Sequence, residues 1–600
     1  MLSNTYRLKL AVISLGLMML PMAYAQTDQP SDGLLVPGLS VSPLEGRRSG
    51  SKATLPSVEL SGEILFQILA SEVAAQRGAL SAATGTSLEL ARFTRDPRLA
   101  RRAVEFALSA GDLVRGLDAA QLWVELDPTD VEARQTSLSL AAAAGRIEGL
   151  GAALRARIAS ATAAEKPAAI IEARRIVSRL EDKKRALEVL DEALTDVRDL
   201  PEAHLAMSRS SVAAGDVPRA LREARAAQAA KPDSETAAML VLQLGIETEP
   251  DQSVAAARAF LAANPNAREL RVMLVRALAQ KQDVDGARAE LDSMARANPE
   301  DFEVLYLQGA LAYQTGRLDD AEKYLKQYSD IDDQRSAAGK SVPGPAEADS
   351  ALFLRVQIAE DQERYDDAFN LLDTVSDPTA ALTARLRQAV IRSKQGKVDE
   401  ARKILALIDP RDVREGTQVA MTESQILREA NQVDEAIKVL DTASKRYPDN
   451  PALMYDLAML QERQGNVAEM ETLLRRVIAI KPDHAHAYNA LGYSLADRKL
   501  RLPEAKALIE RALNLQPDDA FIMDSMGWVY YRMGDNTQAL SYLERAYSIR
   551  PDAEIAIHLG EVFWASGQQD KARQLWRDVK QKDPGNEVLR TTLARLEATL

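Results

Sequence analysis

Residues 485–551 read AHAYNALGYSLADRKLRLPEAKALIERALNLQPDDAFIMDSMGWVYYRMGDNTQALSYLERAYSIRP, which is one pattern written twice. Each copy has a glycine in its first half (Gly492 or Gly527), an alanine after a polar turn, and a proline at its end. Proline cannot continue a helix, and a small residue lets a second helix approach closely. The stretch therefore predicts two units, each made of two packed helices.

The same period continues on both sides of this stretch. Prolines recur at Pro448, Pro482, Pro517, Pro551 and Pro584, at intervals of 34, 35, 34 and 33 residues. Upstream, Pro232, Pro265 and Pro299 are 33 and 34 residues apart. A constant period of this length is typical of stacked helical repeats. We therefore expect helix pairs from about Val58 to Leu600.

Large apolar residues recur at matching places in the last three units. The first helices carry Leu491, Met526 and Leu559, and the second helices carry Ile509, Leu543 and Trp576. These six side chains are expected to fill the seam between paired helices.

This pattern resembles the tetratricopeptide repeat. The unit that ends at Pro551 has the signature residues at their places, namely Gly527, Tyr530, Ala539, Leu543, Ala546 and Pro551. The resemblance implies an all-α, right-handed superhelical solenoid of tetratricopeptide-type helix pairs, whose first helices line a concave surface that binds proteins.

One polar segment interrupts the pattern, residues 331–350, IDDQRSAAGKSVPGPAEADS. We expect an inserted polar loop here, which divides the chain into an N-terminal helical-repeat arm, 58–330, and a C-terminal tetratricopeptide-repeat arm, 351–600. A surface excursion without function is the alternative interpretation of the loop.

The first residues have the pattern of an export signal. Arg7 and Lys9 precede an apolar run, and Ala23-Tyr24-Ala25 precedes Gln26. This predicts a signal peptide over 1–25, cleaved between Ala25 and Gln26, because the apolar run is short for a membrane span. Residues 26–57 are rich in Ser, Gly and Pro and are expected to form a disordered leader. The sequence therefore predicts a periplasmic protein with no direct membrane span.

Composition narrows the function further. The formal net charge is −13 with both signs interspersed, which argues against nucleic-acid binding because that needs a basic face. The chain has no cysteine, which excludes disulfides, thiolate metal sites and lipid attachment to an N-terminal cysteine.

No motif for catalysis, a cofactor or a metal is found. The four histidines are His204, His484, His486 and His558, and they are expected at the surface or in the groove rather than in a metal site, which would need further ligands. An enzyme would need about 150 residues without the repeat, and no such stretch remains. We therefore expect no enzymatic activity.

The repeat register assigns candidate residues to the protein-binding groove. They are His486, Asn489, Tyr493 and Asp497 in the unit that starts at 485, Phe521, Asp524, Trp528, Tyr531 and Arg532 in the unit at 520, and Glu554, Ile557, Glu561 and Trp564 in the unit at 553. Trp and Tyr often dominate binding energy at interfaces. Packing of Trp528 and Trp564 on adjacent helices is the alternative. The groove lacks the lysines that would clamp a terminal carboxylate.

Two stretches resemble a narrower family. They are LASEVAAQRGAL (69–80), followed by LELARFTRDPRLARRAVEFAL (88–108), and the C-terminal stretch 487–535. They resemble proteobacterial periplasmic repeat proteins whose characterised kind is the lipoprotein binding partner of a carboxyl-terminal processing protease. Members of that family are not enzymes, and they hold the protease together with its substrates, which are typically peptidoglycan hydrolases.

The resemblance implies a non-catalytic adaptor for periplasmic proteolysis. One departure is the missing cysteine, so the family's lipid anchor is not expected, and any outer-membrane association would be indirect. A structural scaffold of an envelope assembly, such as polysaccharide export or pilus biogenesis, is the alternative function.

Overall fold

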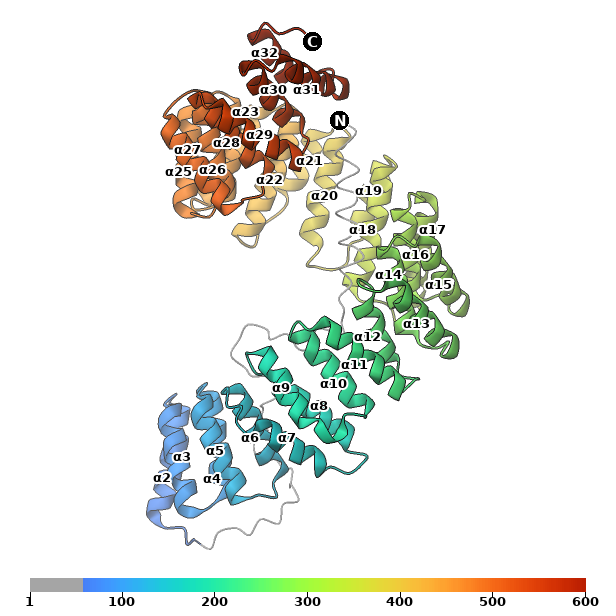
Figure 1. Ribbon diagram of the computed structural model, residues 1–600, viewed down its shortest axis with the longest axis vertical. Helices are drawn as coiled ribbons and strands as arrows, with labels where there is room; N and C mark the ends of the chain where they lie inside the picture. The colour runs from blue at the N-terminus through green and yellow to red at the C-terminus, as the bar shows by residue number, and fades with distance from the viewer. Residues whose placement is uncertain (1–57) are drawn as a thin grey trace. The chain divides into compact units, whose positions relative to one another are not determined.

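The computed structural model describes residues 58–600. Within that range every regular element is an α-helix apart from one short 3-10 helix, and no β-strand occurs. The predicted all-α solenoid of helix pairs is confirmed (Figure 1). The predicted signal peptide (1–25) and leader (26–57) lie outside the described residues.

The chain divides into two compact units, the first ending at Arg317 and the second running from Leu318 to Leu600. The first unit contains α2 (Gly62–Gln76), α3 (Leu80–Thr94), α4 (Pro97–Ser109), α5 (Leu113–Leu126), α6 (Val131–Ala143), α7 (Leu150–Ala159), α8 (Lys166–Val177), α9 (Lys183–Ala193), the 3-10 helix η1 (Thr195–Val197), α10 (Pro201–Ala213), α11 (Val217–Ala230), α12 (Glu235–Gly245), α13 (Pro250–Ala263), α14 (Arg268–Gln280), α15 (Val284–Ala297) and α16 (Phe302–Gln314).

The second unit continues the same alternation of helices and short turns. It contains α17 (Leu318–Ala337), α18 (Pro345–Asp361), α19 (Tyr365–Leu372), α20 (Ala381–Lys394), α21 (Val398–Ala406), α22 (Val413–Glu429), α23 (Val433–Arg446), α24 (Pro451–Arg463), α25 (Val467–Ile480), α26 (Ala485–Asp497), α27 (Leu502–Leu515), α28 (Ala520–Met533), α29 (Asn536–Ile549), α30 (Ala553–Ala565), α31 (Gln569–Lys582) and α32 (Glu587–Arg595).

The ends of α28 show how the repeat sequence sets its helix boundaries. Asp519 Oδ1 accepts hydrogen bonds from the N–H groups of Phe521 and Ile522 at 2.9 and 3.0 Å, which satisfies donors that have no partner within the helix. At the other end Gly534 has a φ of 89°, a left-handed conformation that favours glycine. Asp519, which follows the repeat proline, therefore begins the helix, and Gly534 in the turn ends it.

The predicted close approach of paired helices is confirmed at two glycines. A Cβ atom at Gly492 would lie 2.9 Å from the main-chain oxygen of Ala505, and one at Gly527 would lie 3.1 Å from that of Ala539. Each glycine thus allows the first helix of its pair to contact the backbone of the second.

The six residues predicted to fill the seam are all buried. The apolar clusters follow one another along the chain, for example around Leu190, Leu274 and Leu543, and do not form one central core. This is the packing expected of a solenoid, in which a repeat is stabilised by its neighbours.

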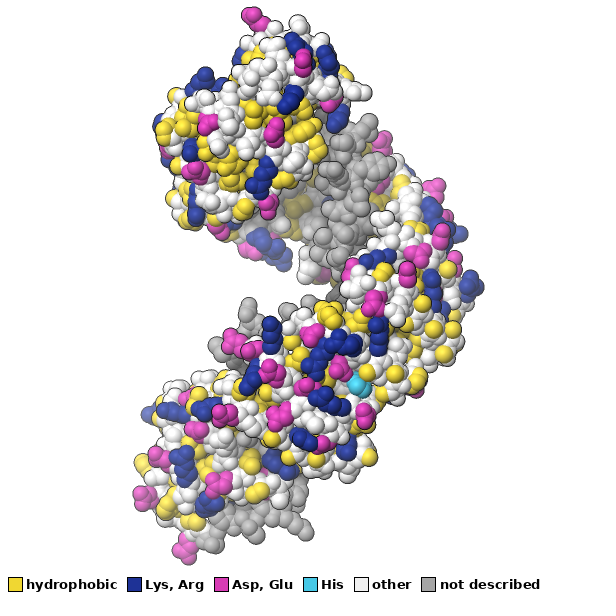
Figure 2. Space-filling model, in the orientation of Figure 1, with side chains coloured by type: hydrophobic (Ala, Val, Ile, Leu, Met, Phe, Trp, Pro, Cys, Tyr) yellow, Lys and Arg dark blue, Asp and Glu magenta, His cyan; other side chains and the backbone are white. Residues whose placement is uncertain are grey.

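Charges of both signs are interspersed on the face that Figure 2 shows. Many of them pair between helices that neighbour each other. Arg102 of α4 lies 2.6 Å from Glu72 of α2, and Arg355 of α18 lies 2.9 Å from Glu322 of α17. The net charge of −13 therefore does not form one large acidic patch on that face.

The predicted inserted loop, 331–350, is much shorter than expected. Helix α17 continues to Ala337, because Ile331 packs inward while its polar neighbours face solvent. Helix α18 already begins at Pro345, and proline is well tolerated in a first helical turn. Glu347 Oε2 accepts a hydrogen bond from the N–H of Gly344 at 2.6 Å, which fixes this start. Only 338–344 lack helical structure, and the division between the compact units lies before α17.

Candidate protein-binding groove

The candidate groove residues lie on three first helices, α26, α28 and α30. Each of these helices starts just after a polar cap. His484 Nδ1 accepts a hydrogen bond from the N–H of Ala487 at 3.2 Å, and Asp552 accepts one from that of Glu554 at 2.9 Å. Because the three helices begin at equivalent places in their repeats, residues at the same repeat position lie on corresponding faces.

A buried cluster of aromatic and charged side chains joins these helices. The Trp528 ring stacks on the His558 ring with centroids 4.3 Å apart, and its Nε1 donates a hydrogen bond to Asp497 at 3.2 Å. His558 Nδ1 lies 2.9 and 3.0 Å from the two carboxylate oxygens of Asp524. The Tyr493 hydroxyl lies 3.4 Å from His558 Nε2. The cluster therefore contains residues of all three helices.

The electrostatics of the cluster centre on His558. Burial alone would lower the pKa of His558, but the charge of Asp524 and the hydrogen bond to it outweigh burial, so the pKa is raised above its ordinary value. The pKa of Tyr493 is raised strongly, first by burial and then by the negative charges of Asp497 and Asp524. Relative to the free side chains, these shifts favour the protonated imidazole of His558 and the neutral phenol of Tyr493.

A second charged pair lies next to this cluster. Glu561 is almost completely buried, and its two carboxylate oxygens accept hydrogen bonds from Arg595 of α32 at 2.8 and 2.5 Å. The hydrogen bond to Glu561 raises the pKa of Arg595. Arg532 donates hydrogen bonds to the main-chain oxygens of Ala496 and Asp497. These contacts tie the first helices together through polar groups as well as apolar ones.

The structure places the predicted groove residues at very different depths. Exposed are His486, Phe521 and Glu554, half-buried are Asn489, Tyr493, Asp497, Tyr531, Arg532 and Trp564, and buried are Asp524, Trp528, Ile557 and Glu561. Their role in binding stays a prediction, but the buried members cannot contact a partner without a change in structure.

Both tryptophans pack on neighbouring helices, which was the alternative interpretation of them. Trp528 is only 3% exposed because His558 covers its ring. Trp564 packs on Trp576 of α31, with ring centroids 5.6 Å apart, and the Arg573 guanidinium lies 5.1 Å from its centroid. Neither is a free aromatic side chain in an open groove.

His558 was missed by the sequence reasoning. It was expected at the surface or in the groove, whereas it is buried between α26 and α28. Its repeat position could have indicated this burial, because the equivalent residues of the two preceding repeats are small, Ala490 and Ser525. A histidine at such a position must displace or contact the neighbouring first helix.

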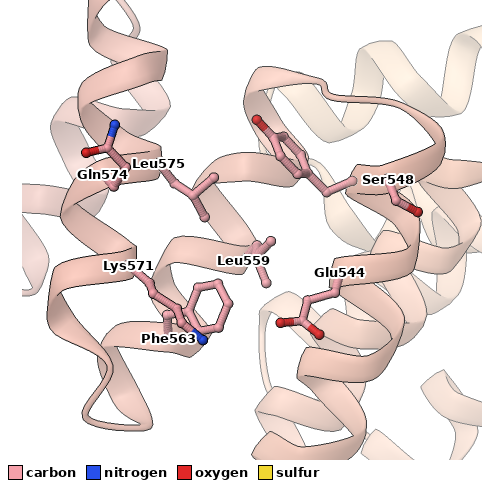
Figure 3. Close-up of a pocket in the computed structure, with 8 residues that line it drawn as sticks. Glu544, Ser548, Leu559, Phe563, Lys571, Gln574 and Leu575 are labelled. Carbon is pink, nitrogen blue, oxygen red and sulfur yellow. The ribbon is translucent and has the colours of Figure 1, made fainter.

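An apolar pocket of about 350 Å³ lies apart from this cluster (Figure 3). Helices α29, α30 and α31 line it, with Glu544 and Ser548, Leu559 and Phe563, and Lys571 and Leu575 respectively. Figure 3 shows Glu544 and Lys571 on opposite sides of the pocket. None of the predicted groove residues lines the pocket.

Two other kinds of site are absent from residues 58–600. No helix in that range is both long and apolar enough to cross a bilayer. No group of three or more His, Asp or Glu side chains in that range could hold a metal ion.

Family models of the tetratricopeptide repeat match several segments of the chain. The matched residues are 248–301, 273–336, 427–492, 483–552 and 525–587. These segments thus contain tetratricopeptide repeats, and such repeats serve as modules for binding proteins.

A TPR repeat-containing protein of Pseudomonas aeruginosa is 33% identical to the chain over 248 residues. The match covers 41% of this chain and 42% of that relative, so the chain spans less than half of the relative's length.

Solved structures that align with the chain include the yeast Tom70 and a thermophilic TPR protein from Thermus thermophilus. Tom70 is 16% identical with a TM-score of 0.34, and the alignment covers 73% of this chain and 96% of Tom70. The Thermus protein is 21% identical with a TM-score of 0.28, over 31% of this chain and 99% of that protein.

Proposed function

We propose that this chain is a non-catalytic adaptor of the periplasm, which brings peptidoglycan hydrolases to a carboxyl-terminal processing protease. The observation that carries the proposal is the presence of tetratricopeptide repeats in both compact units. A long array of binding repeats can hold two proteins at once, and this makes their encounter effectively intramolecular.

The narrower assignment is supported by the resemblance of 69–108 and 487–535 to the protease-partner family. The second stretch contains most of the Tyr493–Trp528–His558 cluster. The periplasmic location is supported by the predicted signal peptide, 1–25. Cleavage between Ala25 and Gln26 would leave an exported chain that begins at Gln26.

The test uses a photo-crosslinking amino acid in place of Phe521, whose side chain is 40% exposed on α28. The matched control carries it in place of Leu407, which is 87% exposed at the end of the second helix α21. Crosslinked proteins are identified by mass spectrometry after irradiation of living cells. We expect the protease or its hydrolase substrates at Phe521 and not at Leu407.

Turnover provides the second measurement. Deleting the gene for this chain should lengthen the half-life of at least one crosslinked hydrolase, because the protease then meets it only by diffusion. Unchanged half-lives, together with crosslinks to polysaccharide-export or pilus components, would replace the proposal with the envelope-scaffold function.

A further inference from the structure

Two hydrogen-bond acceptors beside the Tyr493–His558 contact have no donor. On α26, Asn489 lies one turn before Tyr493, and its Oδ1 atom is buried without a hydrogen-bond partner. On α30, Glu554 lies one turn before His558, and its carboxylate forms no hydrogen bond or ion pair with any of residues 58–600. Residues one turn apart lie on the same helix face, so both acceptors flank the contact on the same side.

Asp524 lies between them in the repeat register. Asn489 and Asp524 occupy equivalent positions of consecutive first helices, each three residues before the repeat glycine. We call Asn489, Tyr493 and Glu554 the acceptor cradle, whereas Asp524 is buried and paired with His558, so it acts on the cradle only through its charge. The cradle's Asn489 Oδ1 atom and its ionised Glu554 carboxylate are acceptors, and its only donors are the Tyr493 hydroxyl and the amide NH2 of Asn489.

The charges around the cradle are mostly negative. Burial contributes most to the raised pKa of Tyr493, and the other contributions come from Asp497, Asp524, Glu554 and Glu462 of α24, all acidic. The neighbouring protein also desolvates the Glu554 carboxyl and raises its pKa, although part of that side chain is open to solvent.

The other acids each contact a counter-charge, whereas Glu554 is influenced by the charge of His558 without a hydrogen bond or ion pair to it. His558 lies against Asp524, Arg498 lies 3.4 Å from Glu462, and Arg532 lies 3.5 Å from Asp497. A buried acceptor without a donor is destabilising, so native proteins usually satisfy such atoms with a ligand or water.

We propose that the acceptor cradle binds the side chain of a lysine or arginine that a partner protein presents in an extended segment. The inference rests on the proposed function as a protein-binding adaptor and specifies the chemistry of its partner. An ammonium group offers three donors and a guanidinium five, and neither has an acceptor. The Tyr493 ring adds a face that attracts cations. An acidic segment would instead meet Glu554 and Asp524 with like charge.

The binding test uses the full mature chain and two fluorescent nine-residue peptides, one alternating alanine and lysine and the other alternating alanine and glutamate. Fluorescence anisotropy should show binding of the lysine peptide only. Glu554→Gln should weaken that binding about five-fold, the size expected for one half-exposed ion pair. Asn489→Ala should weaken it as well, without changing the net charge.

Glu544→Gln is the matched control. Glu544 is also exposed and without an ion pair, but it lies on the second helix α29, so this substitution should leave the affinity nearly unchanged. Circular dichroism verifies that each variant is folded.

Three results would overturn the inference. They are equal binding of the two peptides, equal losses from Glu554→Gln and Glu544→Gln, and no effect of Asn489→Ala. Equal losses would mean that the net charge of −13 attracts the peptide over the whole surface. If the lysine peptide fails but Phe521 still crosslinks the protease or hydrolases, the cradle assignment is wrong and the adaptor function stands. If the crosslinks are absent while the lysine peptide binds at the cradle, the adaptor function is wrong instead.

Discussion

At the scale of single residues, the pair of His558 and Asp524 is a buried polar contact between two C-terminal first helices, α30 and α28. Both side chains are buried and lie 2.9 Å apart. Asp524→Ala leaves the histidine without its counter-charge, so we expect the free energy of unfolding to fall by about 3 kcal/mol. Urea unfolding followed by tryptophan fluorescence measures this.

Asp518→Ala is the control for that substitution. Its carboxylate is 89% exposed in the turn before α28 and lies 3.5 Å from Arg545. Its loss should change stability by no more than about 0.5 kcal/mol. Equal effects of the two substitutions would show that the buried pair does not stabilise these repeats.

The same pair predicts a dependence of stability on pH. The pKa of His558 is raised in the folded protein, where the charge of Asp524 outweighs burial. Its stabilising contribution is therefore complete below the unfolded pKa of about 6.5 and is lost as the pH rises through the folded value. As the pH rises above the unfolded pKa of about 6.5, the wild type should lose more stability than His558→Gln, because the folded pKa of His558 is raised. Parallel profiles of urea midpoint against pH would contradict this.

The residues of the site could be predicted only in part. The repeat register assigned Tyr493, Asp524 and Trp528 to the groove face of the first helices, and each of them contacts His558 there. Burial could not be predicted in the same way, because Trp528 is covered by His558 from the next repeat. A repeat pattern gives the direction of a side chain, whereas its exposure depends on how closely the next first helix approaches.

At the scale of the helix pair, Gly527 tests the close approach of α28 and α29. A Cβ atom there would lie 2.6 Å from Leu543 Cγ and 3.1 Å from the main-chain oxygen of Ala539. The leucine can shift, but the backbone carbonyl has little room to move. Gly527→Ala should therefore lower the free energy of unfolding by about 1–3 kcal/mol, measured by chemical denaturation followed by circular dichroism.

Gly85→Ala provides the opposite case. Gly85 lies inside α3, and a Cβ atom added there would have no neighbouring side chain or second helix within 4 Å. Alanine is the better helix former there by up to about 1 kcal/mol, so this variant should be as stable as the wild type or more stable. If both substitutions stabilise the chain, the close approach at Gly527 is not required.

Helix boundaries followed from the sequence where proline, glycine and aspartate stand at repeat positions, as at Asp519 and Gly534. The segment 331–350 shows the limit of that reasoning. Its polar residues and the Pro343-Gly344-Pro345 run were interpreted as a loop, yet 331–337 extend α17 and Pro345 begins α18. Polar composition is shared by loops and solvent-facing helix surfaces, and proline is compatible with a first turn.

At the scale of the whole molecule, packing is local. The main contacts join helices one or two places apart along the chain, as between α28 and α29 or α26 and α28. The apolar clusters around Leu140 in the first unit and Leu543 in the second contain different sets of residues. In such an array stability is close to a sum of repeat and neighbour terms. One free energy of unfolding therefore need not describe the whole chain.

This locality gives a reciprocal prediction for two buried leucines. Leu543→Ala and Leu140→Ala each empty a fully buried position and should cost about 2–5 kcal/mol locally. Hydrogen exchange with mass spectrometry should show faster exchange in α28–α31 for Leu543→Ala and no change in α4–α6, with the reverse for Leu140→Ala. Faster exchange throughout the chain from either substitution would mean that the two units unfold together. In that case the adaptor could not loosen one set of repeats around a partner while another set stays folded.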